Sequence, residues 1–220
     1  MSSPFFKSAS SLLFLGIALS GCASTRPVAY SGIASAPQLQ ANSRGNSDRV
    51  PYSYSTHVDW RSYTRVIVSP VAVYRDTDNQ FGRTSEEDKD RLADYMHEQF
   101  VTRLAERFQV TDTPSSGTLR VNLTLTGAKA STPVLSTFTH FDLAGGPYNI
   151  VQGARGKEGM MMGSVTYAVE IYDAATNRLL HAYVEKQYPN AMNVTSTFGS
   201  LSAAKTGIRK GADALVAQLN

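Results

Sequence analysis

Cysteine is almost absent from this chain, which holds a single one, Cys22, among 220 residues. No disulfide can therefore form within the chain. Long apolar runs are missing too. The run at residues 12–19 is too short to cross a membrane as a helix, which takes about 20 residues, and none after Cys22 approaches that length. Basic and acidic residues are nearly balanced, 21 against 18, without a clustered basic stripe. This balance argues against a nucleic-acid surface.

The amino terminus has the composition of a secretory signal. Lys7 gives the lead its positive charge, the apolar run at 12–19 follows, and the small residues Ser20 and Gly21 precede Cys22. A charged lead, a short apolar stretch and small residues at a cleavage point are typical of export signals. We predict that residues 1–21 are removed, which takes away Lys7 and no acidic residue and leaves 20 basic against 18 acidic residues.

The sequence Leu19-Ser20-Gly21-Cys22 resembles the lipobox of bacterial lipoproteins. The resemblance implies that the Cys22 thiol takes a diacylglyceryl group, that the chain is cut before it, and that a chain such as palmitate acylates the new amine. Each buried methylene adds about 0.8 kcal/mol of membrane affinity, so three acyl chains make a durable anchor. Ala23, where an inner-membrane lipoprotein has Asp, implies the outer membrane with the domain facing the periplasm. The predicted site residues are therefore Cys22 for lipidation and Leu19, Ser20 and Gly21 for the cleavage motif.

Residues 22–56 predict a lipidated N-terminus followed by a flexible tether. The segment is rich in Ser, Ala, Asn, Arg, Gly and Pro, so it buries too little apolar surface to offset its ordering entropy. A coil of this length has an average span of about 30 Å. Tyr30-Ser31-Gly32 and the pair Tyr52 and Tyr54 are exceptions that can dock onto the domain. Residues 57–220 predict one domain with a core of its own.

The order of elements in residues 57–220 predicts an α+β fold. A capping pattern at Thr84 and Ser85, followed by apolar residues at three- and four-residue spacing, predicts a long helix. A second apolar face predicts a C-terminal helix capped by Thr195 or Thr197. The expected strands cover 65–74 (bent or at an edge because of Pro70), 108–111, 119–126, 165–171 and, after a turn at 173–177, the segment from Leu180 to Val184. Together these elements predict a two-layer sandwich, a mainly antiparallel sheet with two long helices packed on one face.

Two glycines interrupt the apolar face of the expected C-terminal helix. Gly207 and Gly211 each weaken a helix by about 1 kcal/mol relative to alanine, unless close packing makes use of them. Residues 131–162 break the regular pattern altogether, with scattered glycines, aromatic residues and three methionines. Long irregular loops are often functional. A contact surface for a partner or a membrane and a hairpin folded over the sheet both stay open.

No arrangement of residues predicts a catalytic, cofactor-binding or metal site, and we predict a protein that is not an enzyme. The best pair for a metal is His140 and Asp142, and two ligands do not make a site. Residues 153–157 lack the full phosphate-loop pattern. The histidines, none of which stands in a recognised metal-binding spacing, are His57, His97, His140 and His181.

Several short motifs resemble the DUF3313 family of small Gram-negative lipoproteins. They are Tyr30-Ser31-Gly32, Trp60-Arg61-Ser62-Tyr63, Val66-Ile67-Val68-Ser69-Pro70-Val71, the acidic helix start after Ser85, Gly117-Thr118-Leu119-Arg120 and the strand between Gly163 and Asp173. The likeness covers most of the mature chain. Because the motifs are structural, the resemblance supports the envelope address and implies no catalytic residue.

These observations together predict a membrane-anchored envelope lipoprotein that is a non-enzymatic binding or accessory protein for another envelope component. The expected partners are the lipid bilayer, through acylated Cys22, and an envelope protein or cell-wall polymer, without nucleic acid. One alternative is a cell-envelope hydrolase or metal-dependent enzyme whose site gathers residues distant in sequence. Another is a structural or stress-related surface lipoprotein.

Overall fold

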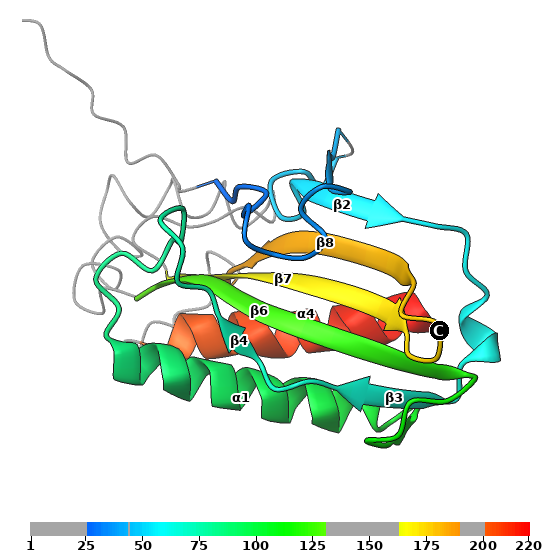
Figure 1. The fold of residues 1–220 in the computed structure, drawn as a ribbon. Coiled ribbons are helices and arrows are strands. Elements are labelled where there is room, and N and C mark those ends of the chain that lie inside the picture. The colour runs from blue at the N-terminus through cyan, green and yellow to red at the C-terminus, as the bar shows by residue number, and fades with distance from the viewer. Residues whose placement is uncertain (1–25, 44, 131–162, 190–200) are drawn as a thin grey trace, which may run out of the picture.

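The computed structural model describes residues 26–43, 45–130, 163–189 and 201–220. The strands are β1 (Gln40–Ala41), β2 (Tyr52–Ser55), β3 (Arg65–Val68), β4 (Ala72–Val73), β5 (Gln109–Val110), β6 (Thr118–Lys129), β7 (Ser164–Asp173) and β8 (Leu179–Gln187); the helices are α1 (Glu86–Leu104), α4 (Ser202–Leu219) and the short 3-10 helix η1 (Trp60–Ser62). The strands join in one open sheet of order β1-β2-β8-β7-β6-β3-β5, with β4 beside β6. Figure 1 shows both long helices on one face of this sheet. The α+β fold class is confirmed.

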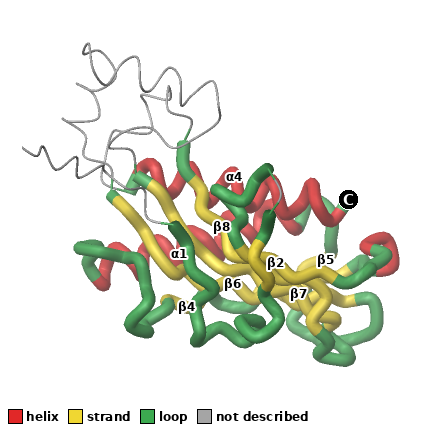
Figure 2. Tube along the Cα trace, turned by 90° about the horizontal axis from the view of Figure 1, so that it is seen from above, coloured by secondary structure: helices red, strands yellow, loops and turns green. Residues whose placement is uncertain are grey.

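The centre of the sheet consists of the three long strands β6, β7 and β8, which run antiparallel to one another. Figure 2 shows them side by side along the length of the molecule. The alternation predicted for β6 is confirmed, because Leu119, Val121, Leu123 and Leu125 are all buried in the main core. The sheet is mixed, since β3 and β4 pair with β6 in the parallel sense. Pro70 lies between these two strands, where the expected single strand is interrupted.

Helix α1 begins where its capping residue predicts. The hydroxyl oxygen of Ser85 accepts a hydrogen bond from the Asp88 amide at 3.2 Å, which satisfies one of the free donors at the helix start. Three acidic residues fill the first turn and complement its positive end. The buried face of the helix repeats at three- and four-residue spacing through Leu92, Ala93, Met96, Phe100 and Leu104.

Helix α4 uses its two glycines for close packing. A Cβ at Gly207 would stand 2.8 Å from Val165 Cγ1, and one at Gly211 would stand 1.7 Å from the Tyr167 hydroxyl oxygen. The helix therefore approaches β7 so closely that a side chain at either position would force neighbouring atoms to move. It starts at Ser202, after Leu201, which has no side-chain capping bond. The expected caps Thr195 and Thr197 lie outside the described residues.

The other face of the sheet is covered by the N-terminal segment, which corrects one prediction. Strand β2 pairs with β8 and β1 pairs with β2. Tyr30 and Ile33 are buried in a second apolar cluster on this face, together with Ala168 and Val184 of the central strands. The prediction of a flexible tether is therefore wrong for residues 26–43 and 45–56. This N-terminal segment contains enough aromatic surface to dock onto the sheet, although it has few aliphatic residues.

Candidate functional site

Tyr30 fixes the N-terminal segment to the sheet. Its side chain is 1% exposed, and its ring packs edge-on against Tyr74 with 5.3 Å between the ring centroids. Its hydroxyl donates a hydrogen bond to Gln80 Oε1 at 3.0 Å. Burial raises the pKa of Tyr30 far above its usual value, so the hydroxyl stays protonated and keeps this bond.

The two residues after Tyr30 complete the attachment. The Gly32 amide donates to the Tyr74 hydroxyl at 3.0 Å, and the Ser31 amide donates to Asp78 Oδ2 at 3.3 Å. A Cβ at position 32 would stand 2.0 Å from Asp76 Oδ2 and 3.0 Å from Tyr74 Cε2, so a larger residue would require these side chains to shift. We call Tyr30, Ser31 and Gly32, held by Tyr74, Asp78 and Gln80, the N-terminal clasp.

The clasp places the start of the described chain beside one end of the sheet. Gln80 Nε2 donates to the Arg26 carbonyl oxygen at 2.7 Å. The Gln80 amide in turn donates to the Thr126 carbonyl oxygen at 2.8 Å, near the last residues of β6. Arg26 therefore lies close to the end of β6, and it is four positions after Cys22 in the chain.

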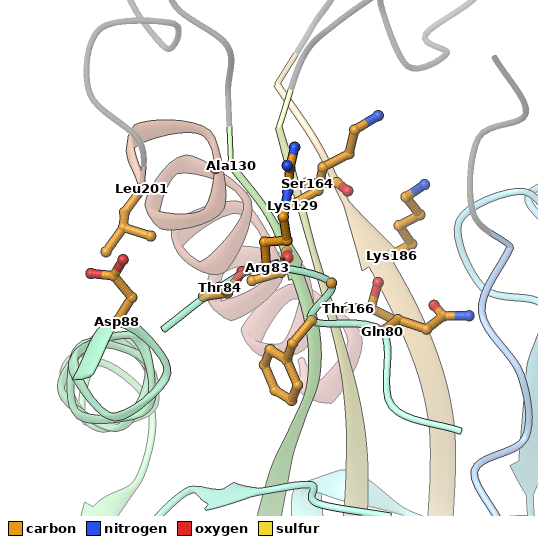
Figure 3. A pocket seen from close by; sticks show the side chains of 13 residues that line it. Gln80, Arg83, Thr84, Asp88, Lys129, Ala130, Ser164, Thr166, Lys186 and Leu201 are labelled. Carbon is orange, nitrogen blue, oxygen red and sulfur yellow. Dashed lines mark hydrogen bonds between the residues drawn. The ribbon is translucent and has the colours of Figure 1, made fainter. Parts of the chain in front are cut away.

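At this same end of the sheet there is an open cavity of about 570 Å³, which we call the basic cleft. It lies among the start of α1, the end of β6, the start of β7 and the start of α4. Figure 3 shows Arg83, Lys129 and Lys186 extending toward the same side, the top of the view. The residues that line the cleft are Gln80, Phe81, Gly82, Arg83, Thr84, Asp88, Lys129, Ala130, Ala128, Ser164, Thr166, Lys186 and Leu201.

The charged residues of the cleft differ in exposure and in pairing. Arg83 and Lys129 are exposed, whereas Lys186 is buried. Among the described residues that line the cleft, the one carboxylate, Asp88, is already paired with Arg91 at 2.7 Å. Within the part of the chain that the structure describes, neither Arg83 nor Lys129 forms a salt bridge. The cleft therefore offers two exposed cations to an anionic group.

A second polar cluster is enclosed between α4 and the central strands and serves the fold. Glu185 accepts hydrogen bonds from the Tyr167 hydroxyl and from Gln187 Nε2, both at 2.7 Å. Gln187 Oε1 accepts from Arg49 Nη1 at 2.9 Å. Burial raises the pKa of Glu185, and these hydrogen bonds and the charge of Arg49 oppose the rise. None of the four residues lines the basic cleft, so we assign them a structural role.

The histidines of the described ranges do not converge. His57 is exposed, His97 has Nε2 3.4 Å from the Val68 carbonyl oxygen, and His181 is half-buried in β8. No group of three metal-ligating side chains occurs in the part of the chain described here. In that same part, neither long helix has the length and hydropathy needed to cross a bilayer.

Other predicted residues lie outside the described ranges. These are the lipidation and cleavage residues Leu19, Ser20, Gly21 and Cys22, the pair His140 and Asp142, and the whole of 131–162. Sequence reasoning missed the basic cleft, because its cations come from three separate elements without a shared motif. The clasp did have a signal, since Tyr30-Ser31-Gly32 stood out from a polar segment.

The molecule is an α+β protein with an open mixed sheet, two helices on one face and the N-terminal segment on the other. The chain belongs to the DUF3313 family, described as "Protein of unknown function (DUF3313)", whose family model matches residues 29–215. No curated protein matches it in sequence.

Two solved structures resemble the fold at low identity. The PelC dodecamer from Paraburkholderia phytofirmans has 9% identity and a TM-score of 0.37, covering 75% of this chain and 95% of that chain. A putative neuraminyllactose-binding hemagglutinin homolog from Helicobacter pylori has 9% identity and a TM-score of 0.34, covering 72% of this chain and 81% of that chain.

Proposed function

We propose that this protein is a lipoprotein of the bacterial cell envelope, anchored in the outer membrane through lipid on Cys22, and that its domain is a non-enzymatic binding or accessory protein for another envelope component. The observation that supports the anchor best is the lipobox-like sequence at residues 19–22. The clasp is compatible with this anchor, because it holds Arg26, which is four positions after Cys22, at one end of the domain.

The basic cleft supports a binding role. Arg83 and Lys129 are exposed cations, and the hydroxyl-bearing Ser164 and Thr166 line the same cavity. Cations and hydroxyl groups are donors for carboxylate and phosphate oxygens. A cleft of this composition fits an acidic group of an envelope component better than an apolar ligand.

The anchor is tested by metabolic labelling in a Gram-negative host. The native protein should take up radioactive palmitate and separate with outer membranes, whereas Cys22→Ser should lose the label and appear in the soluble or unprocessed fraction. Ser24→Ala, two residues further on, is the matched control and should behave as the native protein does. Labelling that persists in Cys22→Ser would overturn the proposal.

The binding role is tested by crosslinking in intact cells, followed by purification of the protein from membranes. The native protein should give discrete adducts, and Cys22→Ser should lose them because it no longer resides at the membrane. The purified domain incubated with isolated cell envelopes should release no soluble fragments. Release of such fragments would replace the binding role with a hydrolytic one.

A further inference from the structure

The clasp limits how far the domain can stand from a lipid on Cys22. Gln80 holds the Arg26 carbonyl oxygen at 2.7 Å, and Tyr30 is anchored through the same Gln80 side chain. Four residues of chain reach at most about 14 Å even when fully extended. A tether of the length expected from the sequence would instead have an average span of about 30 Å. The attachment point on the domain is therefore close to the anchor, at the end that carries the basic cleft.

We propose that the basic-cleft end of the domain lies against the membrane surface, with Arg26, Arg83 and Lys129 contacting anionic phospholipid headgroups. The proposal rests on lipidation of Cys22 and names the membrane itself as a partner of the cleft. All three cationic residues are exposed. They come from the N-terminal segment, the loop before α1 and the end of β6, and the clasp and the sheet bring these elements together.

Several acidic residues at this end are engaged by protein groups, whereas Asp76, beside Gly32, is exposed and forms no salt bridge among the described residues. Glu86 pairs with Arg75 and Lys89, and Asp88 pairs with Arg91. In the clasp, Asp78 accepts hydrogen bonds from the Tyr74 hydroxyl and the Ser31 amide. Arg83 and Lys129 have no such partners among the salt bridges of the described residues. These two residues of the cleft therefore favour negative headgroups.

The opposite end of the domain points away from the anchor. Strand β6 has 12 residues, so Lys129 and Thr118 lie about 36 Å apart along it. The turn after β7 sits at the far end, where the Ala174 amide donates to the Thr118 carbonyl oxygen at 2.9 Å. Ala130 and Ala175 are exposed residues at the near and far ends and give a matched pair of labelling positions.

Orientation is tested on the mature chain, residues 23–220, with a polyhistidine tag in place of Cys22 and held on vesicles by nickel-chelating lipids. Ala130→Cys and Ala175→Cys each carry one fluorophore, and a headgroup spin label in phosphatidylglycerol-containing vesicles quenches at short range. We expect strong quenching at position 130 and little at 175. Equal quenching at the two positions would overturn the orientation. Because the tag replaces Cys22, this result does not depend on lipidation in cells, which palmitate labelling tests on its own.

The headgroup contact is tested with charge variants in the same vesicles without the nickel lipid, at low ionic strength. Each basic residue near an anionic surface strengthens binding about fivefold, so Arg83→Ala with Lys129→Ala should weaken vesicle binding about 25-fold. Arg61→Ala with Arg178→Ala, exposed positions at the far end, is the matched control and should bind as the native domain does. Equal binding to phosphatidylcholine and phosphatidylglycerol vesicles, or an equal loss in the control, would overturn the contact.

Discussion

The side chain of Tyr30 holds the N-terminal segment against the sheet. Its buried ring and its hydrogen bond to Gln80 attach a segment whose composition predicts a free coil. We expect Tyr30→Ala to lower the free energy of unfolding by about 3 kcal/mol, the usual cost of truncating a large buried ring. Residues 26–43 should then become sensitive to protease.

Val28→Ala is the matched control for this change. Val28 lies in the same segment but is 37% exposed, so its truncation should change stability by less than about 0.5 kcal/mol and leave the segment resistant. Denaturant unfolding and limited proteolysis measure the two effects. Equal protease sensitivity of Tyr30→Ala and the native chain would contradict the clasp.

His181 gives the stability a dependence on pH. Burial lowers its pKa from 6.5 to about 4, and its buried Nδ1 has no hydrogen-bond partner among the residues that the structure describes. The unfolded chain binds a proton on this imidazole more readily than the folded chain does. The contribution of His181 to the free energy of unfolding is therefore complete above pH 6.5 and is lost as the pH falls toward 4. The loss reaches up to about 3 kcal/mol.

We therefore expect His181→Gln to flatten the fall in unfolding free energy between these two pH values, measured by denaturant titration at a series of pH values. His57→Gln changes an exposed histidine and should keep the native slope. A native slope in His181→Gln would show that other groups cause the fall.

At the scale of elements, helix α4 depends on the absence of a side chain at Gly211. A methyl group there would meet the Tyr167 hydroxyl, which donates to Glu185. Alanine favours the helix by about 1 kcal/mol, but overpacking a core costs about 1–3 kcal/mol. We expect Gly211→Ala to destabilise the protein by up to about 2 kcal/mol.

The same substitution in a Tyr167→Phe background isolates the contact. Phenylalanine lacks the oxygen that would stand 1.7 Å from the new methyl group and keeps the ring Cζ at 2.8 Å. Gly211→Ala should therefore cost at least about 0.5 kcal/mol less in this background. Chemical denaturation of the four proteins gives the coupling energy. Additive effects of the two substitutions would show that the close approach of α4 to β7 does not limit residue 211.

The elements with a strong local pattern were predictable. Strand β6 alternates apolar and polar side chains, and α1 carries its capping serine and a periodic apolar face, so both follow from neighbours in the sequence. The docking of residues 26–43 was not predictable in the same way. It depends on Tyr74, Asp78 and Gln80, which follow Tyr30 by 44 to 50 residues, and no local pattern reports such a contact. The basic cleft was hidden for the same reason, since Arg83, Lys129 and Lys186 are distant in sequence.

At the scale of the whole molecule, the clasp converts a long N-terminal segment into a short link. The sheet then separates two ends with different surroundings. The end with Arg26 and the basic cleft faces the proposed membrane, and the end with η1 and the turn after β7 faces the periplasm in the proposed orientation (Figure 1). An envelope partner that meets the anchored protein from the periplasmic side would meet the far end first.

The height of the domain above the bilayer tests this arrangement as a whole. In supported phosphatidylcholine bilayers, which offer the cleft no anionic lipid and hold the protein through its lipid alone, neutron reflectometry should find protein density beginning within about 14 Å of the headgroups. Tyr30→Ala opens the clasp and frees up to about 30 residues of link, so the density should move outward and broaden toward the average span of such a coil, about 28 Å. Val28→Ala should leave the profile unchanged, and circular dichroism confirms that both variants stay folded. A native profile as broad as that of Tyr30→Ala would mean that the link is long in the native protein and that the clasp does not set the distance to the membrane.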